Sequence, residues 1–124
     1  MSEPIVLVAD DDDDILLLVT TRLRRDGFEV ISARNGEEAL ALAKERRPAI
    51  AVLDIGMPGL DGLEVLERIR ADADLEGTRV LLLTAKAQES DVRRGYDSGA
   101  DAYVRKPFSP ADLSARVREL LDGT

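Results

Sequence analysis

The chain contains no cysteine, which limits the chemistry open to it. A disulfide framework and thiol catalysis are excluded, and a reducing cytoplasm is compatible with this composition. Long apolar runs are missing as well: the first apolar stretch covers only residues 5–9 before an aspartate, and no basic segment precedes it. Because signal peptides and membrane spans need longer apolar segments, we expect neither, and we expect a cytoplasmic protein.

Positive charge is also scarce. The 17 Lys and Arg residues stand against 25 Asp and Glu residues, which gives a formal net charge of −8. A nucleic-acid-binding face needs clustered Lys and Arg to neutralise phosphates, and the arginines of this chain are scattered over its predicted helices. We therefore expect no direct contact with nucleic acid.

The length of 124 residues is that of one domain with a core of its own. The sequence has no internal repeat and no low-complexity linker, and its last apolar residue lies three positions before Thr124. We expect a single domain over residues 1–124, without an output domain in this chain.

Short apolar runs alternate with amphipathic segments along the whole sequence. Strands are predicted at residues 5–9, 28–33, 49–54, 79–85 and 102–106, and helices at 15–25, 36–47, 62–71, 90–98 and from 110 onward. Asn35 and Ser109 are the predicted N-caps of the second and last helices. Strict alternation of this kind requires a parallel sheet with right-handed crossovers and helices on both faces, which is a doubly wound α/β fold.

Asp54 is the most informative residue, because it ends an apolar strand and opens a Gly/Pro-rich loop at residues 55–62. Asp10 and Asp11 follow the first strand in the same way, and later strands deliver Thr84 and Lys106. Open α/β sheets bind ligands at the carboxyl ends of their strands. We therefore expect these five side chains to meet at one edge of the sheet.

These segments resemble the receiver domain of two-component response regulators over nearly the whole chain. The matching segments are residues 8–12, 52–54, 57–62, 83–85, 99–103 and 106–108. The resemblance implies a flavodoxin-like sheet of five strands in the order 2-1-3-4-5 with five helices.

A carboxylate that accepts a phosphoryl group must approach an anion, so it needs cations nearby. Asp10 and Asp11 beside Asp54 would repel one another unless a hard divalent cation lay among them, and Mg²⁺ suits carboxylates and phosphate oxygens. The resemblance makes Asp54 the phosphoacceptor. It makes Asp11, Asp54 and the backbone carbonyl of Gly56 direct metal ligands, with Asp10 acting mainly through a bound water.

The resemblance also assigns the remaining polar groups. Lys106 pairs with one phosphoryl oxygen, and Thr84 donates a hydrogen bond to another. A cis peptide bond between Lys106 and Pro107 is implied, which aims the ammonium at the site. Tyr103 is implied to turn in response to Thr84, so that the surface of helix 90–98, strand 102–106 and the last helix changes.

The chain has no histidine and cannot be its own phosphohistidine donor. The phosphoryl group must come from a histidine kinase, a phosphotransfer protein or a small molecule. We expect a signalling switch and not an enzyme, apart from its own phosphorylation and dephosphorylation. It acts on a downstream effector protein or domain, as a monomer or as a phosphorylation-dependent dimer.

Other interpretations stay open from the residues alone. Residues 10–14 also fit a solvated acidic helix start, and Thr84, Tyr103 and Lys106 fit a strand end, a core aromatic and a surface lysine. A Mg²⁺-dependent aspartate phosphatase would need an acid two residues after Asp54, where Gly56 stands. An interaction-only pseudo-receiver would be expected to lack the acidic pair or the lysine, and a flavin module would not place aspartates after its first strand.

Two positions depart from common receiver choices. Many receivers carry a side chain at the position of Gly56, and Lys86 occupies a position that is often acidic or polar. Both lie next to the acceptor, so these two positions bear on the lifetime of the phosphorylated state and not on phosphorylation itself.

Overall fold

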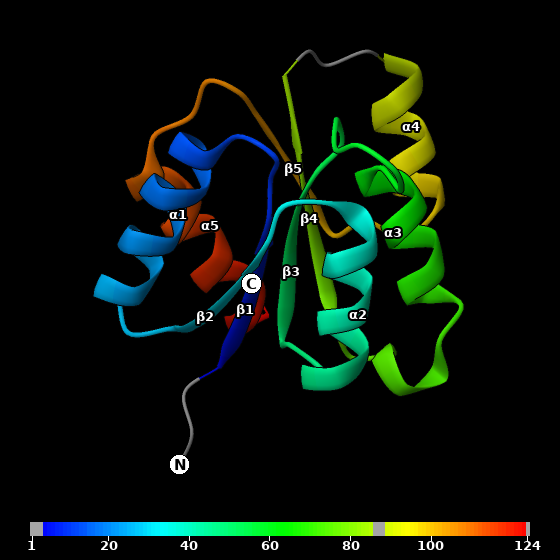
Figure 1. Ribbon diagram of the computed structural model, residues 1–124, viewed down its shortest axis with the longest axis horizontal. Coiled ribbons are helices and arrows are strands. Elements are labelled where there is room, and N and C mark those ends of the chain that lie inside the picture. The colour runs from blue at the N-terminus through cyan, green and yellow to red at the C-terminus, as the bar shows by residue number, and fades with distance from the viewer. Residues whose placement is uncertain (1–3, 86–88, 124) are drawn as a thin grey trace.

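Strands and helices alternate along the chain in the computed structural model (Figure 1). The structure describes the backbone of residues 4–85 and 89–123 and the side chains of residues 4–85 and 93–123. Lys86 lies outside the described residues. The elements are β1 (Ile5–Ala9), α1 (Asp13–Arg25), β2 (Glu29–Ala33), α2 (Gly36–Arg46), β3 (Ile50–Asp54), α3 (Gly62–Arg70), η1 (Ala73–Leu75), β4 (Arg79–Thr84), α4 (Glu89–Asp97), β5 (Ala102–Arg105) and α5 (Pro110–Asp122). The predicted alternation of five strands and five α-helices is confirmed.

The five strands form one parallel sheet in the order β2-β1-β3-β4-β5, as predicted. Helices α1 and α5 cover one face, and α2, α3 and α4 cover the other (Figure 1). Because β3 is central, all five of its residues are buried, and its last residue is Asp54. The apolar positions of the strands therefore lead directly to a polar group at the sheet edge.

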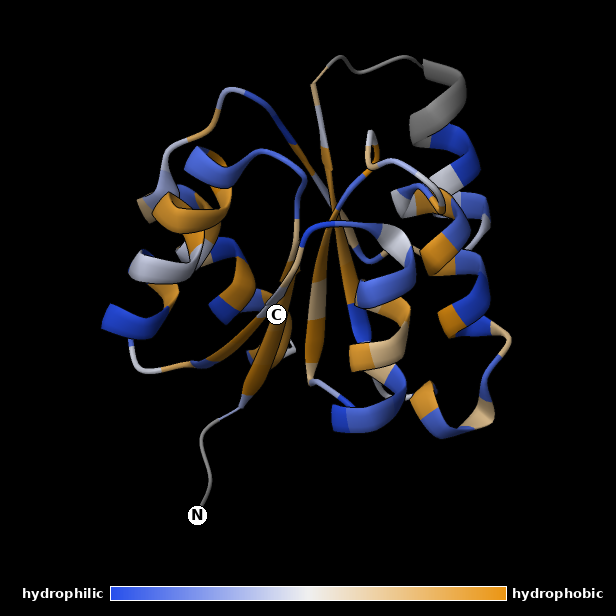
Figure 2. Cartoon of the chain, in the orientation of Figure 1, coloured by the Kyte–Doolittle hydropathy of each residue, from blue (hydrophilic) through white to orange (hydrophobic). Residues whose placement is uncertain are grey.

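Alternate strand residues feed two separate apolar clusters, one on each side of the sheet. Figure 2 shows that the strands are largely hydrophobic and that the helices are amphipathic, with polar residues outward. In the part of the chain that the structure describes, no helix has the length and apolar character needed to cross a membrane.

Side-chain caps explain where the helices begin. Asn35 and Ser109 cap α2 and α5 as predicted. Helix α1 begins at Asp13, two residues earlier than predicted, because the carboxylate of Asp12 accepts the N–H groups of Asp14 and Ile15. The acidic run after β1 thus divides into site residues and a helix cap.

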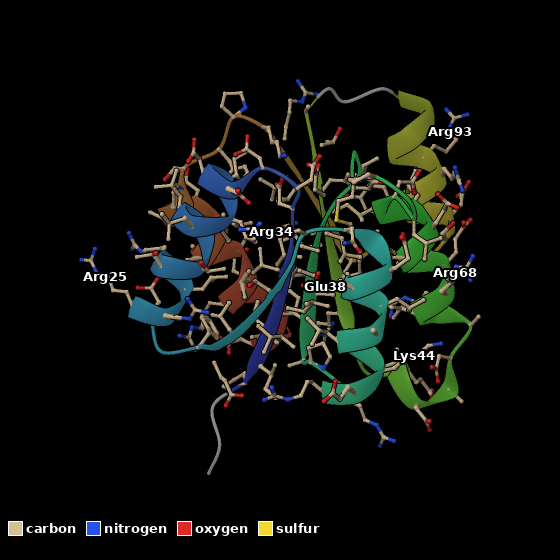
Figure 3. All side chains as sticks on the ribbon, in the orientation of Figure 1. Arg25, Arg34, Glu38, Lys44, Arg68 and Arg93 are labelled. Carbon is tan, nitrogen blue, oxygen red and sulfur yellow. The ribbon has the colours of Figure 1, made fainter. Side chains whose placement is uncertain are left out.

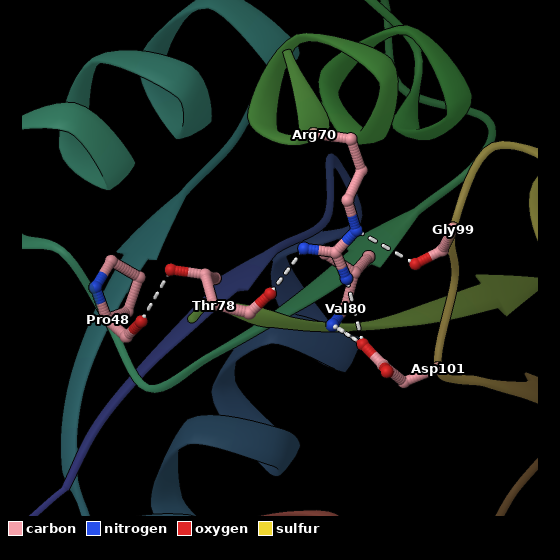
Figure 4. Close-up of polar contacts among 6 residues, drawn as sticks. All are labelled: Pro48, Arg70, Thr78, Val80, Gly99 and Asp101. Atoms are coloured by element: carbon pink, nitrogen blue, oxygen red, sulfur yellow. Dashed lines mark hydrogen bonds and ion pairs between the residues drawn. The ribbon is translucent and has the colours of Figure 1, made fainter. Parts of the chain in front are cut away.

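The opposite edge of the sheet is tied together by Arg70 at the end of α3 (Figure 4). Its guanidinium donates to the carbonyls of Gly99 at 2.9 Å and Thr78 at 2.5 Å, and to Oδ2 of Asp101 at 2.9 Å. The same Asp101 oxygen accepts the N–H of Val80 at 2.8 Å. These bonds fix the starts of β4 and β5. The polar groups predicted for the functional site lie at the other edge of the sheet, at the carboxyl ends of the strands.

Candidate functional site

The predicted site residues do meet at the carboxyl edge of the sheet. Asp54 ends β3 and Thr84 ends β4, while Asp10 follows β1 and Lys106 follows β5. Parallel strands in register bring these ends level, and the N–H of Asp10 bonds to the carbonyl of Ala33 at 3.1 Å to hold the end of β1. The sheet therefore brings these groups into one site.

Three carboxylates form the acidic part of the site. One oxygen from each of Asp10, Asp11 and Asp54 lies within 4.8 Å of the others. Asp10 is fully buried and Asp54 is 5% exposed, whereas Asp11 is open to solvent. Oδ1 of Asp10 accepts the N–H of Asp12 at 2.9 Å, and among the described residues its buried Oδ2 has no partner other than the ammonium of Lys106.

Lys106 supplies the positive charge. Its Nζ lies 3.0 Å from Oδ2 of Asp10 and 3.4 Å from Oδ1 of Asp54, and its side chain is 16% exposed. The peptide bond to Pro107 is cis, as predicted, and the N–H of Lys106 bonds to the carbonyl of Thr84 at 2.7 Å. The ammonium thus faces both buried carboxylates from the end of β5.

The electrostatics of the site favour a further cation. Burial, and next the charge of Asp10, raise the pKa of Asp54 to about 6 even though Lys106 acts against the increase. Burial would lower the pKa of Lys106, but its interactions with Asp10 and Asp54 outweigh this and raise it above the ordinary value. Three carboxylates and one ammonium leave a formal charge of −3 + 1 = −2.

The donor set fits Mg²⁺. Carboxylate oxygens are the ligands that this ion prefers, a divalent charge balances the excess of −2, and the exposed side of Asp11 leaves room for retained waters. Oδ2 of Asp10 is buried with the ammonium of Lys106 as its partner at 3.0 Å, and a water on such an ion would give it a second one. Asp10, Asp11 and Asp54 are the residues that would hold the metal.

The loop between β3 and α3 places Gly56 beside the acceptor. The N–H of Gly56 lies 3.3 Å from Oδ1 of Asp54, and a Cβ at this position would have only the two carboxylate oxygens within reach, at 3.9 and 4.0 Å. The space next to Asp54 is therefore open. The sequence correctly singled out Gly56 as a neighbour of the acceptor; its carbonyl as a metal ligand stays a prediction.

Helix α2 supports the same loop through Glu37, a contact that the sequence analysis did not foresee. Oε1 of Glu37 accepts the N–H of Leu60 at 2.8 Å, and its carboxylate lies against Gly59, whose φ is +72°. No local pattern signals this bond, because 23 residues separate its partners. The N–H of Gly62 closes the loop on the carbonyl of Ile55 at 3.2 Å.

Thr84 and Tyr103 lie on adjacent strands. Thr84 is buried at the end of β4, and Tyr103 of β5 is half-buried beside Leu82, its register partner. The centroid of the Tyr103 ring lies 4.9 Å from the centroid of the Tyr96 ring on α4. Tyr103 therefore connects the sheet to α4, and its movement in response to Thr84 stays a prediction.

An apolar groove of about 340 Å³ adjoins the site between α1 and the segment after β5. It is lined by Ile15, Leu18, Val19, Ala85, Lys106, Pro107, Phe108 and Pro110. Leu18, which lines the groove, is 59% exposed, and its neighbour Leu17 on α1 is 65% exposed. This surface was not predicted from the sequence. Its signal was the unbroken apolar run at residues 15–19, which covers more of the helix than one buried face requires.

Basic side chains are spread over the surface. The labelled Arg25, Lys44, Arg68 and Arg93 come from α1, α2, α3 and α4 and point outward (Figure 3). This distribution agrees with the scattered pattern read from the sequence.

Known proteins resemble this chain in sequence and in fold. The family model of the response regulator receiver domain matches residues 6–118 of this chain. The chain belongs to this family. This receiver is 42% identical over 116 residues to the DNA-binding response regulator MtrA of Mycolicibacterium smegmatis, covering 94% of the chain and 50% of that protein. It is 43% identical to the alkaline phosphatase synthesis transcriptional regulatory protein PhoP of Bacillus subtilis, covering 94% and 48%.

Solved structures agree with the sequence relatives. A CheY-like receiver domain from Methanospirillum hungatei superimposes with a TM-score of 0.93 at 32% identity, covering 98% of this chain and 96% of that one. The chemotaxis response regulator CheY4 of Vibrio cholerae gives 0.88 at 29% identity, covering 97% and 99%. The receiver is thus a two-component signalling module with the fold that the sequence resemblance implied.

The receiver spans about half the length of the curated relatives that it matches. DNA binding is in the name of MtrA, a protein about twice as long. That the present chain makes no direct contact with nucleic acid therefore stays a prediction, as does its organisation as one domain over residues 1–124.

Proposed function

We propose that this receiver accepts a phosphoryl group on Asp54 with the help of Mg²⁺ and passes the signal to an effector through α4, β5 and α5. The observation that carries the proposal is the position of Asp54: a buried carboxylate next to Asp10 and Asp11 on one side and 3.4 Å from the ammonium of Lys106 on the other. An acidic helix start or a surface lysine would not explain this convergence.

In the transfer, an oxygen of Asp54 attacks the phosphorus of the donor, the new O–P bond forms, and the bond to the leaving group breaks with its electron pair. Mg²⁺, when bound, supplies positive charge for the phosphoryl oxygens. Lys106 moves from pairing with two carboxylates to pairing with a phosphoryl oxygen, which requires no proton transfer. Asp10 keeps the ammonium near the acceptor before the reaction.

Transmission follows from the neighbours of the acceptor. Thr84 ends the strand next to β3 and donates its hydroxyl to a phosphoryl oxygen. Tyr103 then turns into the space behind Thr84, and the two arrangements of the core differ in population between the free and phosphorylated receiver. The effector reads the changed surface of α4, β5 and α5.

The donor is a separate histidine kinase, phosphotransfer protein or small molecule, because the chain has no histidine. We place a protein donor on the groove between α1 and Phe108, since Lys106 both lines this groove and pairs with Asp54. The exposed Leu17 and Leu18 extend this apolar surface along α1. The reaction takes place in the cytoplasm, and the resting receiver is a monomer that phosphorylation can convert to a dimer.

Intact-protein mass spectrometry tests the acceptor. With acetyl phosphate and Mg²⁺, the wild-type receiver gains one phosphoryl group, and so does the control Asp97→Asn, which changes an exposed carboxylate of α4. Asp54→Asn gains none. Full labelling of Asp54→Asn, or labelling that does not need Mg²⁺, would contradict the proposal.

A second measurement tests the output surface. Beryllofluoride with Mg²⁺ is expected to shift amide resonances in α4, β5 and α5 of the wild type as well as in the loops of Asp10 and Asp54. Lys106→Ala and Thr84→Ala still accept some phosphate but lose the distant shifts. Shifts confined to the loops in the wild type would rule out this route.

The phosphatase alternative predicts sustained turnover of a generic phosphomonoester, and a single labelling event without turnover counts against it. An interaction-only receiver predicts no labelling at all. Retention of Asp10, Asp11, Asp54 and Lys106 in one contact cluster favours the phosphorylatable receiver over both.

A further inference from the structure

Gly95 occupies a buried position inside α4, where glycine is an unfavourable helix residue. Replacing glycine by alanine in a helix ordinarily stabilises the helix. At this position, however, a Cβ would overlap Oη of Tyr103 and lie 2.6 Å from its Cζ and 2.9 Å from a methyl group of Leu82. The end of the Tyr103 ring therefore fills the space that a side chain at residue 95 would occupy.

The surroundings hold the ring in this place. Tyr96, the next residue of α4, packs its ring 4.9 Å from that of Tyr103 with an interplanar angle of 56°. Leu82 is the register partner of Tyr103 on β4. Thr84 lies two residues after Leu82 on the same strand, so both side chains face α4's side of the sheet.

We propose that Gly95 is a positioning residue that sets the resting place of Tyr103 and thereby the balance between the two states of the α4–β5 surface. The inference rests on the proposed function, in which Tyr103 turns toward Thr84. With glycine at position 95, the ring has a site against α4 and the resting state is favoured. A larger residue removes this site and moves the balance toward the phosphorylated arrangement.

The effect should be visible without any phosphoryl group. In Gly95→Ala, the Tyr103 ring resonances lose the influence of the Tyr96 ring. The amides of α4 and β5 move part of the way toward their positions in the wild type with beryllofluoride and Mg²⁺. Because coupling between two sites is reciprocal, the affinity for beryllofluoride rises by the factor by which the population of the phosphorylated arrangement rises, a few-fold.

Two control variants test whether the effect depends on contact with the Tyr103 ring. Gly77→Ala changes a glycine that has no neighbouring atom within 4 Å of a Cβ, and it should leave α4 and β5 unchanged. In a Tyr103→Leu background, Gly95→Ala meets no ring and only the methyl group of Leu82, so it should shift amides only around residues 95 and 82. The two substitutions are therefore strongly non-additive.

Unchanged Tyr103 resonances in Gly95→Ala would overturn the inference, and so would equal effects in the two backgrounds. If Gly95→Ala alone fails to fold, Tyr103→Leu must restore folding to the double variant, and failure to do so also overturns it. If beryllofluoride and Mg²⁺ caused no resonance shifts in the wild type, the proposed function would be contradicted. The ring resonances of Tyr103 would still test the role of Gly95 separately.

Discussion

Lys106 Nζ lies 3.0 Å from Oδ2 of Asp10, a buried oxygen that has no other partner within the described part of the chain. The two residues follow β5 and β1, which β3 and β4 separate in the sheet. The lysine side chain therefore reaches across the carboxyl edge and passes Asp54 on the way. One ammonium holds together a site whose carboxylates would otherwise repel one another.

The first prediction concerns the stability of the metal-free receiver. The pKa of Asp54 is raised from 3.8 to about 6 in the folded state, so the folded state binds its proton more tightly than the unfolded chain does. This contribution to stability is complete below pH 4 and is lost as the pH rises through 6, at a cost of up to about 3 kcal/mol. Asp54→Asn should remove the cost.

Urea denaturation in EDTA between pH 4 and 8 measures this effect. Asp54→Asn should be more stable than the wild type by about 1–3 kcal/mol above pH 6, and the difference should vanish near pH 4. Asp97→Asn, at an exposed site, controls for the loss of one charge. A stability difference that does not depend on pH would show that Asp54 is ionised normally.

The second prediction is stabilisation by Mg²⁺. A ligand that binds only the folded state raises its stability by about 2.7 kcal/mol at a hundred times its dissociation constant. The melting temperature of the wild type should rise with millimolar Mg²⁺, because the ion offsets the excess negative charge of the site. Asp11→Ala should lose the rise, and Asp14→Ala, which changes an exposed acid in the first turn of α1, should keep it. An equal response in both variants would place the ion elsewhere.

The fold was predictable because its determinants are local. The run that ends in Asp54 is apolar at every position, and only a strand covered on both faces explains this. Caps such as Asn35 and Ser109 act within three residues, so they too can be read from sequence. The start of α1 was misplaced because five consecutive aspartates offer several N-caps, and only the structure shows that Asp12 is the one used.

The residues of the candidate site were predictable from the sequence, but the contacts that hold them in place were not. Strand ends mark Asp10, Asp54 and Lys106, since parallel topology fixes where they meet. Contacts between distant elements leave no such mark: Glu37 meets Leu60 only because α2 packs beside α3. The need for glycine at residue 95 likewise depends on where the Tyr103 ring lies.

A third prediction tests the support that Glu37 gives to the loop carrying Gly56. An exposed hydrogen bond to a charged group is worth about 1 kcal/mol, so Glu37→Ala should weaken Mg²⁺ binding by up to about fivefold. Glu37→Gln keeps an acceptor for the N–H of Leu60 and should bind Mg²⁺ nearly as the wild type does. Isothermal titration calorimetry measures the affinity.

Glu38→Ala is the matched control, because Glu38 is the next residue of α2 and is also exposed. It should leave Mg²⁺ binding unchanged. Equal losses in Glu37→Ala and Glu38→Ala would mean that the acidic start of α2 acts only through its charge. No loss in either would show that the loop holds its shape without Glu37.

The last prediction separates protein donors from small-molecule donors. Leu18 lines the apolar groove beside Lys106 and is mostly exposed, so Leu18→Asp should cost little stability. A charge there should disrupt docking of a phosphohistidine protein and slow its phosphotransfer about tenfold or more, because burying an unpaired charge in an apolar contact costs free energy. Acetyl phosphate needs no docking surface, so its labelling rate should not change.

Ala41→Asp, which adds the same charge to the exposed side of α2, should keep both rates. The rates can be compared by gel-shift or mass analysis with whichever donor protein labels the wild type fastest, and an unimpaired transfer to Leu18→Asp would move the donor to another face.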